Sequence, residues 1–420
     1  MLRPLLLLCA VLLLPALHTR AATSSPAAAP ARPAAFGVAA HGNVSIEWWY
    51  VNAHVSTSAG HHYALIGSFF QFGNGHSPFD PSAVAPRAHY LIYAVTDLDS
   101  KTQRPYSLGD GAMVAYLKQI APFLAVQNPH DKGAQSLLAA LNKGALPAPH
   151  RQFTGRAIVA ARPFRLAYGT NTLAADNAEN TAFTLDLGAS GRDKIHLTLR
   201  STKPAMAVGG KGETGLKRAN DMYYFSLTRC AVGGSIDTGA GAEAITGGDG
   251  WFDHQWGNSW VASNNGWDWW GVQLTDGTDI LFFRQRDLAT GKVFFPLATF
   301  MDKNGHQTVT HNIKFTPDKS SVWKSLRTGV SYPLAWTVAF PDHRLSLHIT
   351  TAVKDQEMPI LGPGSGIWEG ACDVAAYRQS GMHNGTSYVQ LVPGTAYMEL
   401  VGYGSPAVKA QTSKMAAKGK

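Results

Sequence analysis

A duplicated segment constrains the fold of this chain more than any other feature of its sequence. Glu47-Trp48-Trp49-Tyr50 opens an apolar stretch, and a polar turn separates it from a second apolar run that ends Phe69-Phe70-Gln71. More than two hundred residues later, Asp268-Trp269-Trp270 opens the same arrangement, which ends Phe282-Phe283-Arg284-Gln285. Two apolar runs joined by a short polar turn are typical of a β-hairpin. Each half of the chain is therefore expected to contain one of two related hairpins.

The two halves also end alike. Gly248-Asp249-Gly250-Trp251-Phe252-Asp253 and Gly394-Thr395-Ala396-Tyr397-Met398-Glu399 share their order of glycine, aromatic residue, apolar residue and carboxylate. The opening and closing carboxylates are 206 residues apart in the first half and 131 in the second. Apolar residues recur at helical spacing between about 110 and 145, so a helical insertion there accounts for most of the difference.

The remaining segments alternate apolar and polar residues over short stretches, with turn signals such as Asn304-Gly305 between them. We expect an all-β protein with two antiparallel β-barrels, or strongly curved sheets, in pseudo-symmetric tandem. The first barrel is assigned to residues 37–262 and the second to residues 263–405. A barrel of about eight strands can hold one small apolar ligand.

Composition argues against one class of partner. Charged residues make up 15% of the chain and its formal net charge is +8. The excess of Lys and Arg is spread out within the expected folded part, without the basic stripe that a nucleic-acid-binding surface needs. We therefore expect no nucleic-acid partner.

Both ends of the chain are expected to lie outside the barrels. A basic start, an apolar centre and the small-x-small sequence Thr19-Arg20-Ala21 are typical of a secretory signal peptide over residues 1–21. An uncleaved membrane anchor is the alternative. Residues 22–36 are rich in Ala and Pro and predict a disordered linker, and residues 406–420 predict a basic disordered tail. The protein is expected to be secreted, and periplasmic in a bacterium.

Two cysteines, Cys230 and Cys372, remain after removal of the signal peptide. In an exported protein they could form a disulfide, but two buried free thiols are the favoured interpretation. They are too few for a cysteine-rich zinc site, and His61-His62 lacks regular ligand spacing, so no metal site and no cofactor are expected.

The strongest candidate for acid–base chemistry is the segment Trp251-Phe252-Asp253-His254-Gln255-Trp256. On a strand, His254 and Trp256 would share one face while Asp253 points to the other. A histidine on a buried face beside a tryptophan could exchange protons with a ligand. The alternative is structural: Asp253 and His254 satisfy backbone groups where the halves meet, and the tryptophans fill the core.

Carboxylates beside the paired tryptophans are the second set of candidates. Glu47 and Asp268 lie in strands that should be buried, where a carboxylate must be paired or held neutral as a proton donor. An ion pair with an arginine such as Arg229 or Arg284 is the structural alternative. The same two alternatives apply to Glu357 and Glu369.

Taken together, these motifs resemble the AttH and carotenoid 1,2-hydratase family of exported lipocalin-like proteins, which includes predicted secreted hydrolases. The resemblance covers residues 40 to 404 and rests on Glu47-Trp48-Trp49-Tyr50, Lys203-Pro204, Gly209-Gly210, Tyr223-Tyr224-Phe225-Ser226, Asp253-His254-Gln255-Trp256-Gly257, Trp267-Asp268-Trp269, Asp355-Gln356-Glu357, Trp368-Glu369-Gly370 and Tyr397-Met398-Glu399-Leu400-Val401-Gly402-Tyr403. It implies two lipocalin-like barrels and a pocket for a hydrophobic ligand.

The carotenoid hydratase branch protonates a carbon–carbon double bond, and water then captures the cation. Its His-x-Trp motif corresponds to His254 and Trp256 in this chain. Its Tyr-x-Asp motif would fall near Leu281-Phe282-Phe283, which contains no carboxylate, so the usual proton donor of that branch is missing here.

The resulting hypothesis is an exported hydratase or hydrolase that acts on a lipid or terpenoid. Its candidate acid–base residues are His254, Asp253 and Glu47, and its candidate ligand-binding residues are Trp48, Trp49, Trp256, Asp268, Trp269, Tyr397 and Glu399. The alternative is a carrier of lipophilic molecules that works with components of an export transporter, as the resemblance to AttH implies.

Overall fold

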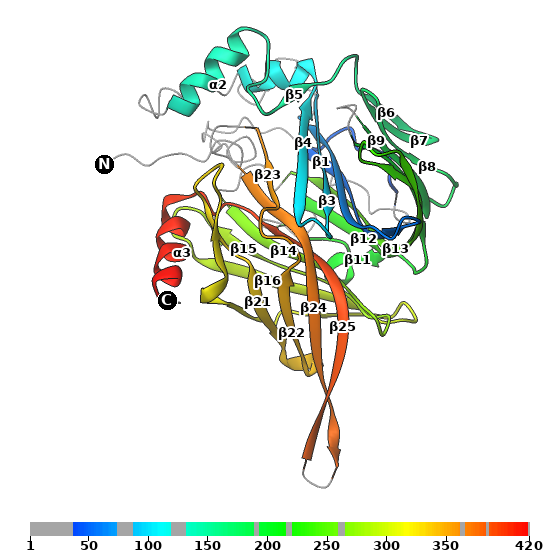
Figure 1. The fold of residues 1–420 in the computed structure, drawn as a ribbon, viewed down its shortest axis with the longest axis vertical. Coiled ribbons are helices and arrows are strands. Elements are labelled where there is room, and N and C mark those ends of the chain that lie inside the picture. The colour runs from blue at the N-terminus through cyan, green and yellow to red at the C-terminus, as the bar shows by residue number, and fades with distance from the viewer. Residues whose placement is uncertain are drawn as a thin grey trace, which may run out of the picture.

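We describe a computed structural model of the chain (Figure 1). It describes residues 37–73, 87–118, 132–188, 193–215, 221–258, 265–361, 366–383 and 386–418. The expected signal peptide and linker, residues 1–36, lie outside the described residues.

The first half forms a 13-stranded sheet in which the strands follow the order β5-β4-β3-β2-β1-β13-β12-β10-β9-β8-β7-β6, with β11 added beside β12. Neighbouring strands are antiparallel except β4 and β5, which are parallel. The strands are β1 (Ile46–Thr57), β2 (His62–Phe72), β3 (Ala88–Asp97), β4 (Thr102–Gly109), β5 (Arg151–Gln152), β6 (Ile158–Ala161), β7 (Phe164–Tyr168), β8 (Asn171–Ala175), β9 (Ala182–Leu187), β10 (Lys194–Ser201), β11 (Met206–Ala207), β12 (Met222–Asp237) and β13 (Ala242–Gly257).

The second half forms a 10-stranded sheet in the order β17-β16-β15-β14-β25-β24-β22-β21-β18, with β23 beside β24, and a separate pair of strands, β19 and β20. The strands are β14 (Asn265–Leu274), β15 (Asp279–Asp287), β16 (Val293–Met301), β17 (Gln307–Thr310), β18 (Lys314–Pro317), β19 (Val322–Lys324), β20 (Ser331–Pro333), β21 (Ala335–Phe340), β22 (Leu345–Thr351), β23 (Glu357–Pro359), β24 (Gly366–His383) and β25 (Thr386–Leu400). Short 3₁₀ turns occur at Val208–Gly210, Lys319–Ser321 and Pro341–His343.

The all-β prediction is confirmed, and so are the two hairpins. β1 and β2 form the first hairpin, and β14 and β15 form the second. In each half the strand that carries the closing motif pairs with the first strand of its hairpin, so β13 lies beside β1 and β25 lies beside β14. The halves lie against each other, and the β24–β25 ribbon extends beyond the body of the molecule (Figure 1).

Each sheet curls around aromatic side chains that fill its interior. In the first sheet, Tyr168 of β7 donates a hydrogen bond to the Phe70 carbonyl of β2 and its ring meets Phe69 edge-on. In the second, Trp270 of β14 contacts the rings of Phe315 and Trp336, which come from β18 and β21. These contacts bring strands from distant positions of each sheet together across its interior.

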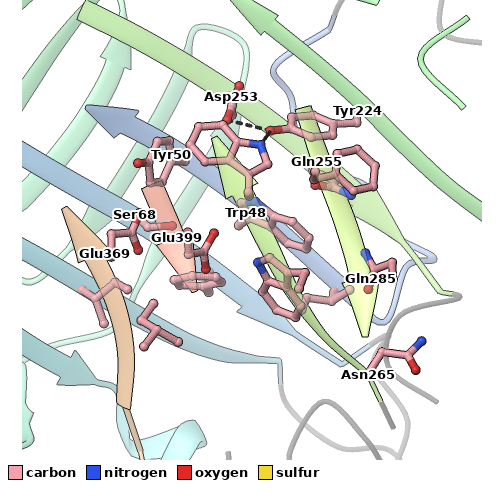
Figure 2. A pocket seen from close by; sticks show the side chains of 17 residues that line it. Trp48, Tyr50, Ser68, Tyr224, Asp253, Gln255, Asn265, Gln285, Glu369 and Glu399 are labelled. Carbon is pink, nitrogen blue, oxygen red and sulfur yellow. Dashed lines mark hydrogen bonds between the residues drawn. The ribbon is translucent and has the colours of Figure 1, made fainter. Parts of the chain in front are cut away.

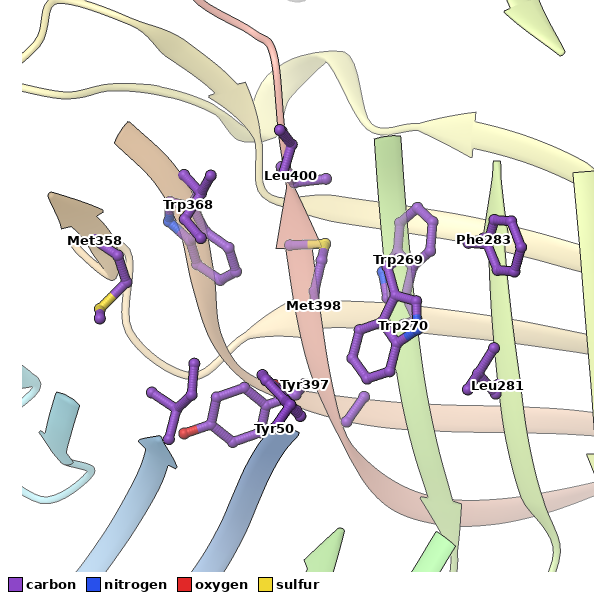
Figure 3. Close-up of a cluster of buried hydrophobic side chains, with 14 of the residues drawn as sticks. Tyr50, Trp269, Trp270, Leu281, Phe283, Met358, Trp368, Tyr397, Met398 and Leu400 are labelled. Carbon is purple, nitrogen blue, oxygen red and sulfur yellow. The ribbon is translucent and has the colours of Figure 1, made fainter. Parts of the chain in front are cut away.

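Large side chains also pack between the two sheets. Figure 3 shows this cluster around β14, β24 and β25, with Tyr50 from β1 reaching the same region as Tyr397. Rings occupy the interiors of both sheets, so the apolar pocket does not lie inside a barrel, where a ligand cavity was expected. That pocket is found between the sheets.

The predicted helical insertion is helical at 111–118 and again in α2 (Lys132–Asn142). Its buried residues Met113, Leu117, Leu137 and Leu141 belong to the cluster between the sheets. Among the described residues, no helix has both the length and the apolar character needed to cross a membrane.

The prediction of a disordered tail is wrong for most of its length, because α3 (Pro406–Lys418) is a helix. The Ser405 hydroxyl accepts a hydrogen bond from the Val408 amide, and Pro406 occupies the first turn, a combination that favours helix initiation. Val408 and Thr412 are buried against the body of the molecule. Cys230 and Cys372 are buried free thiols.

Candidate active site between the two sheets

An apolar pocket lies between the sheets, with an empty space of about 910 Å³ that includes the part open to solvent (Figure 2). β1, β2, β3, β12 and β13 form one wall, and β14, β15, β24 and β25 form the other. Its aromatic side chains are Trp48, Tyr50, Phe70, Tyr224, Trp267, Trp269 and Phe283. The polar groups among them are Ser68, Asp253, Gln255, Asn265, Gln285, Glu369 and Glu399.

The duplicated motifs supply equivalent residues to opposite walls of this pocket. Trp48 and Trp269 are the same position of the two hairpins, and Asp253 and Glu399 end the two closing motifs. The next tryptophan of each hairpin, Trp49 or Trp270, points into the interior of its own sheet, since successive side chains of a strand alternate between faces. The pocket is therefore built with approximate twofold symmetry.

Asp253 is a buried carboxyl group whose hydrogen-bond partners are all uncharged. Its Oδ2 accepts a hydrogen bond of 2.8 Å from Tyr224, and its Oδ1 accepts one of 2.7 Å from the Trp251 indole and another from the Ser226 hydroxyl. Trp269 donates in turn to the Tyr224 oxygen, at 3.0 Å. Burial raises the pKa of Asp253 to about 7, although these hydrogen bonds oppose the shift.

Glu369 and Glu399 face each other directly across β24 and β25. Burial and the neighbouring Glu399 carboxylate raise the pKa of Glu369 well above its usual value, while a hydrogen bond from Tyr50 opposes the shift. Burial also raises the pKa of Glu399, against a hydrogen bond from Trp267. Two adjacent carboxyl groups in an apolar site resist double ionisation, so this pair holds at least one proton near neutral pH.

Several polar atoms that line the pocket have no partner within the described part of the chain. They are Ser68 Oγ, Gln255 Nε2, both polar atoms of the Gln285 amide and Glu369 Oε1. Buried polar groups are normally hydrogen-bonded, and leaving one unpaired costs about 1–3 kcal/mol. Their concentration here fits a ligand or water molecules that supply the missing bonds.

Glu47 and His254, two of the three predicted acid–base residues, lie on the reverse face of β1 and β13. His254 Nε2 and His41 Nδ1 are 2.8 and 2.7 Å from the same oxygen, Glu47 Oε1. Burial alone would raise the pKa of Glu47, but its hydrogen bonds with the two histidines lower it overall. Burial lowers the pKa of His254. The prediction that His254 and Asp253 point to opposite faces is confirmed, but the pocket lies on the Asp253 side.

Trp49 and Trp256, predicted to bind ligand, pack around this histidine cluster and do not line the pocket. Trp49 stacks on His254 at 5.0 Å between ring centroids and donates its indole N–H to the Val38 carbonyl. Trp256 stacks on His41 at 4.2 Å. Strand alternation places both on the face opposite Trp48 and Gln255.

Asp268 also lies away from the pocket and is structural. It is fully buried and forms ion pairs with Arg284 and Arg286, each at 2.6 Å. The structural alternative, an ion pair between Asp268 and an arginine such as Arg284, is therefore the one observed. Burial would raise its pKa, but the two guanidinium groups lower it overall. Glu357 similarly pairs with Arg327.

Tyr397 is buried beside His54, with ring centroids 5.3 Å apart, and does not line the pocket. Of the ten predicted site residues, the structure places Trp48, Asp253, Trp269 and Glu399 in the pocket and brings His254 and Glu47 together outside it.

The sequence profile of the AttH-like family matches residues 146–403. The chain belongs to the AttH-like family.

Other similarities agree with this assignment. The AttH-like chain is 29% identical over 170 residues to dehydratase AsqC of Emericella nidulans, a match that covers 38% of the chain and 46% of that protein. The match thus spans less than half of that relative. The fold of this chain is similar to that of an AttH protein from Nitrosomonas europaea (TM-score 0.62, 22% identity, 87% of this chain and 94% of that one). It is also similar to that of kievitone hydratase from Nectria haematococca (TM-score 0.61, 16% identity, 88% and 94%).

Sequence reasoning on this AttH-like chain missed Glu369, Gln285, Tyr224 and His41 as members of either cluster. For Glu369 the sequence predicts either an ion pair or a neutral proton donor. It does not predict the position opposite Glu399, because that position depends on strand register. Gln285 had a usable signal, since it ends the second copy of the duplicated hairpin. His41 had none, because it reaches Glu47 from the irregular segment before β1.

Proposed function

We propose that this protein is a hydro-lyase that adds water to, or removes it from, a hydrophobic molecule bound between the two sheets. The proposal rests on three buried carboxyl groups in the pocket, Asp253, Glu369 and Glu399, whose raised pKa values favour the protonated form. Among the described residues none of these three carboxyl groups forms a salt bridge with Lys, Arg or His, and all three pKa values are raised. Carboxyl groups kept protonated near neutral pH can act as general acids.

Removal of water needs an acid and a base on one substrate. A protonated carboxyl group of the Glu369–Glu399 pair gives its proton to the leaving hydroxyl, and the carbon–oxygen bond breaks with loss of water. Ionised Asp253 removes a proton from the neighbouring carbon, and that electron pair forms the double bond. Addition of water is the reverse. The pKa of Asp253, about 7, suits a group that must both accept and return a proton.

The pocket walls support an apolar substrate with a few oxygen atoms. Trp48, Trp267 and Trp269 offer aromatic surface, and the unpaired amides of Gln255 and Gln285 offer hydrogen bonds to hydroxyl or carbonyl groups. The relatives named as a dehydratase and a hydratase support the same reaction class. The expected lipid or terpenoid fits these requirements.

Isotope exchange into the bound molecule tests the proposal. The purified protein is analysed by native mass spectrometry for a co-purified small molecule, which is then incubated with fresh protein in H₂¹⁸O. We expect the hydroxylated form to gain ¹⁸O. The Asp253→Asn variant should exchange about 10²–10⁴ times more slowly, the usual contribution of one acid–base group. Recovery of the molecule without label after incubation with folded wild-type protein would contradict the proposal.

A carrier of lipophilic molecules is the second candidate, favoured by the largely aromatic lining. A carrier would retain its ligand unchanged in the same experiment, and Asp253→Asn would not alter the result. The signal-peptide pattern at residues 1–21 supports action outside the cytoplasm for either function, and a partnership with an export transporter fits only the carrier.

A further inference from the structure

The cluster of His41, Glu47 and His254 is separate from the pocket and remains unexplained by the proposed reaction. Glu47 lies on β1, His254 on the neighbouring strand β13, and His41 in the segment that precedes β1. His41 Nδ1, Glu47 Oε1 and His254 Nε2 all lie within 4.8 Å of one another. The side chains of Glu47 and His254 are fully buried, while that of His41 is about one-third exposed.

The orientation of His254 directs Nε2 of its ring at the Glu47 carboxylate. Its Nδ1 lies 3.0 Å from the Gly37 carbonyl oxygen, which can only accept a hydrogen bond, so Nδ1 carries a proton. In the neutral ring, Nε2 then presents a lone pair to Glu47 Oε1 at 2.8 Å. Two electron-pair donors in contact repel each other, and either a proton shared between them or a metal ion coordinated by both atoms offsets that repulsion.

Other features resemble those that prepare metal ligands in proteins. A histidine ligand usually donates its second ring N–H to a carbonyl or carboxylate, which fixes the tautomer, and Gly37 supplies that carbonyl. Trp49 and Trp256 stack on His254 and His41 and hold the planes of the two rings.

We propose that His41 Nδ1, Glu47 Oε1 and His254 Nε2 form a binding site for a divalent transition-metal ion of the zinc type. Two imidazole nitrogens and one carboxylate oxygen suit Zn²⁺ or Co²⁺, whereas Mg²⁺ and Ca²⁺ prefer oxygen ligands only. The bound ion would join the segment before β1 to β13 at one end of the first sheet. This site is independent of the acid–base groups in the pocket.

Metal titration of the untagged, chelator-treated full chain tests this proposal. We expect calorimetry with Zn²⁺ to give one saturable site, and Co²⁺ to give the visible absorption of a nitrogen- and oxygen-ligated ion. His41→Ala removes a ligand without opening a buried cavity and should weaken binding at least about tenfold, the lower end of losses for disturbed metal sites. Glu47→Gln keeps the side-chain shape and should weaken binding similarly.

His62→Ala is the matched control, because exposed His62 also pairs with a carboxylate, Asp99, at 3.1 Å. This variant should bind Zn²⁺ like the wild type. Absence of a saturable site near one equivalent in folded wild-type protein would overturn the proposal. Equal weakening by His41→Ala and His62→Ala, or no weakening by His41→Ala, would do the same, since binding would then occur at surface histidines.

Discussion

Asp253 combines a buried position with hydrogen bonds that fix its two oxygens, and this has a consequence for stability as well as for chemistry. Its pKa is about 7 in the folded protein and near 3.8 in an unfolded chain. Between these values the folded state holds a proton that the unfolded state has lost. Its contribution to stability is therefore complete below about pH 4 and decreases as the pH rises to about 7.

Asp253→Asn should remove this pH dependence, because an amide of the same shape does not ionise. As the pH rises from 4 to 8, the wild type should lose stability that the variant keeps. The difference between their free energies of unfolding should therefore change by about 2–4 kcal/mol in favour of the variant, following about 1.4 kcal/mol per unit of pKa shift. Urea unfolding at several pH values measures the difference. Parallel curves for the two proteins would show that Asp253 titrates normally.

Gln285 has a fully buried amide with no hydrogen-bond partner among the described residues, and this predicts a conflict between stability and binding. Gln285→Met keeps the approximate volume and removes the unpaired group, so the ligand-free variant should be more stable by about 1–2 kcal/mol. Ligand retention should fall, because the variant can no longer form hydrogen bonds with the ligand. Urea unfolding and native mass spectrometry measure the two effects. A variant that keeps its ligand as wild type does would exclude Gln285 from recognition.

At the scale of single elements, close approach between neighbouring strands depends on particular glycines. A side chain at Gly248 of β13 would place its Cβ 2.3 Å from the His54 carbonyl oxygen of β1, whereas at the adjacent Gly247 no atom of the described residues lies within 4 Å. The two residues thus form a matched pair on one strand.

Gly248→Ala should destabilise the protein by about 1–3 kcal/mol, because either the side chain or the β1–β13 pairing must shift. Gly247→Ala has open space and should change the free energy of unfolding by less than about 0.5 kcal/mol. Equilibrium unfolding of both variants, followed by tryptophan fluorescence, provides the comparison. Similar values for both would mean that β13 adjusts without cost at Gly248.

At the scale of the whole molecule, an ion-pair cluster joins the two sheets. Asp279 of β15 is fully buried and pairs at 2.6 Å with both Lys203, which follows β10, and Arg229 of β12. Thr228 donates a further hydrogen bond of 2.9 Å to the same carboxylate. Part of the Lys203-Pro204 motif noted in the sequence therefore holds the halves together.

Asp279→Ala removes the carboxylate that pairs with Lys203 and leaves Arg229 only its longer contact with Asp249, at 3.6 Å. The variant should lose about 3–5 kcal/mol of stability, and it should lose ligand because the pocket walls separate. Asp276→Ala is the control. It breaks the more exposed pair with Arg378, at 3.1 Å, and should cost less than about 1 kcal/mol. Chemical unfolding and ligand retention measure both outcomes. Equal costs for the two variants would show that the cluster does not hold the sheets together.

The sequence alone determined the β-rich class, the two hairpins and the strand faces, because strand side chains alternate with a period of two and the motifs occur twice. It therefore predicted Trp48, Trp269, Asp253 and Glu399 as site residues, and it placed Asp253 and His254 on opposite faces of their strand. The same local rules also predict the helical insertion. The sequence also contains a helix-start signal for α3, Ser405-Pro406, in which the Ser405 hydroxyl accepts a hydrogen bond from the Val408 amide.

Tertiary structure decided where the pocket lies and which candidates reach it. Aromatic rings fill both sheet interiors, an apolar pocket lies between the sheets, and the Asp253 face of β13 lines it. Strand register placed Glu369 opposite Glu399, and the path of the chain before β1 brought His41 to Glu47. These contacts join residues far apart in sequence or held by irregular backbone, and no local periodicity encodes them.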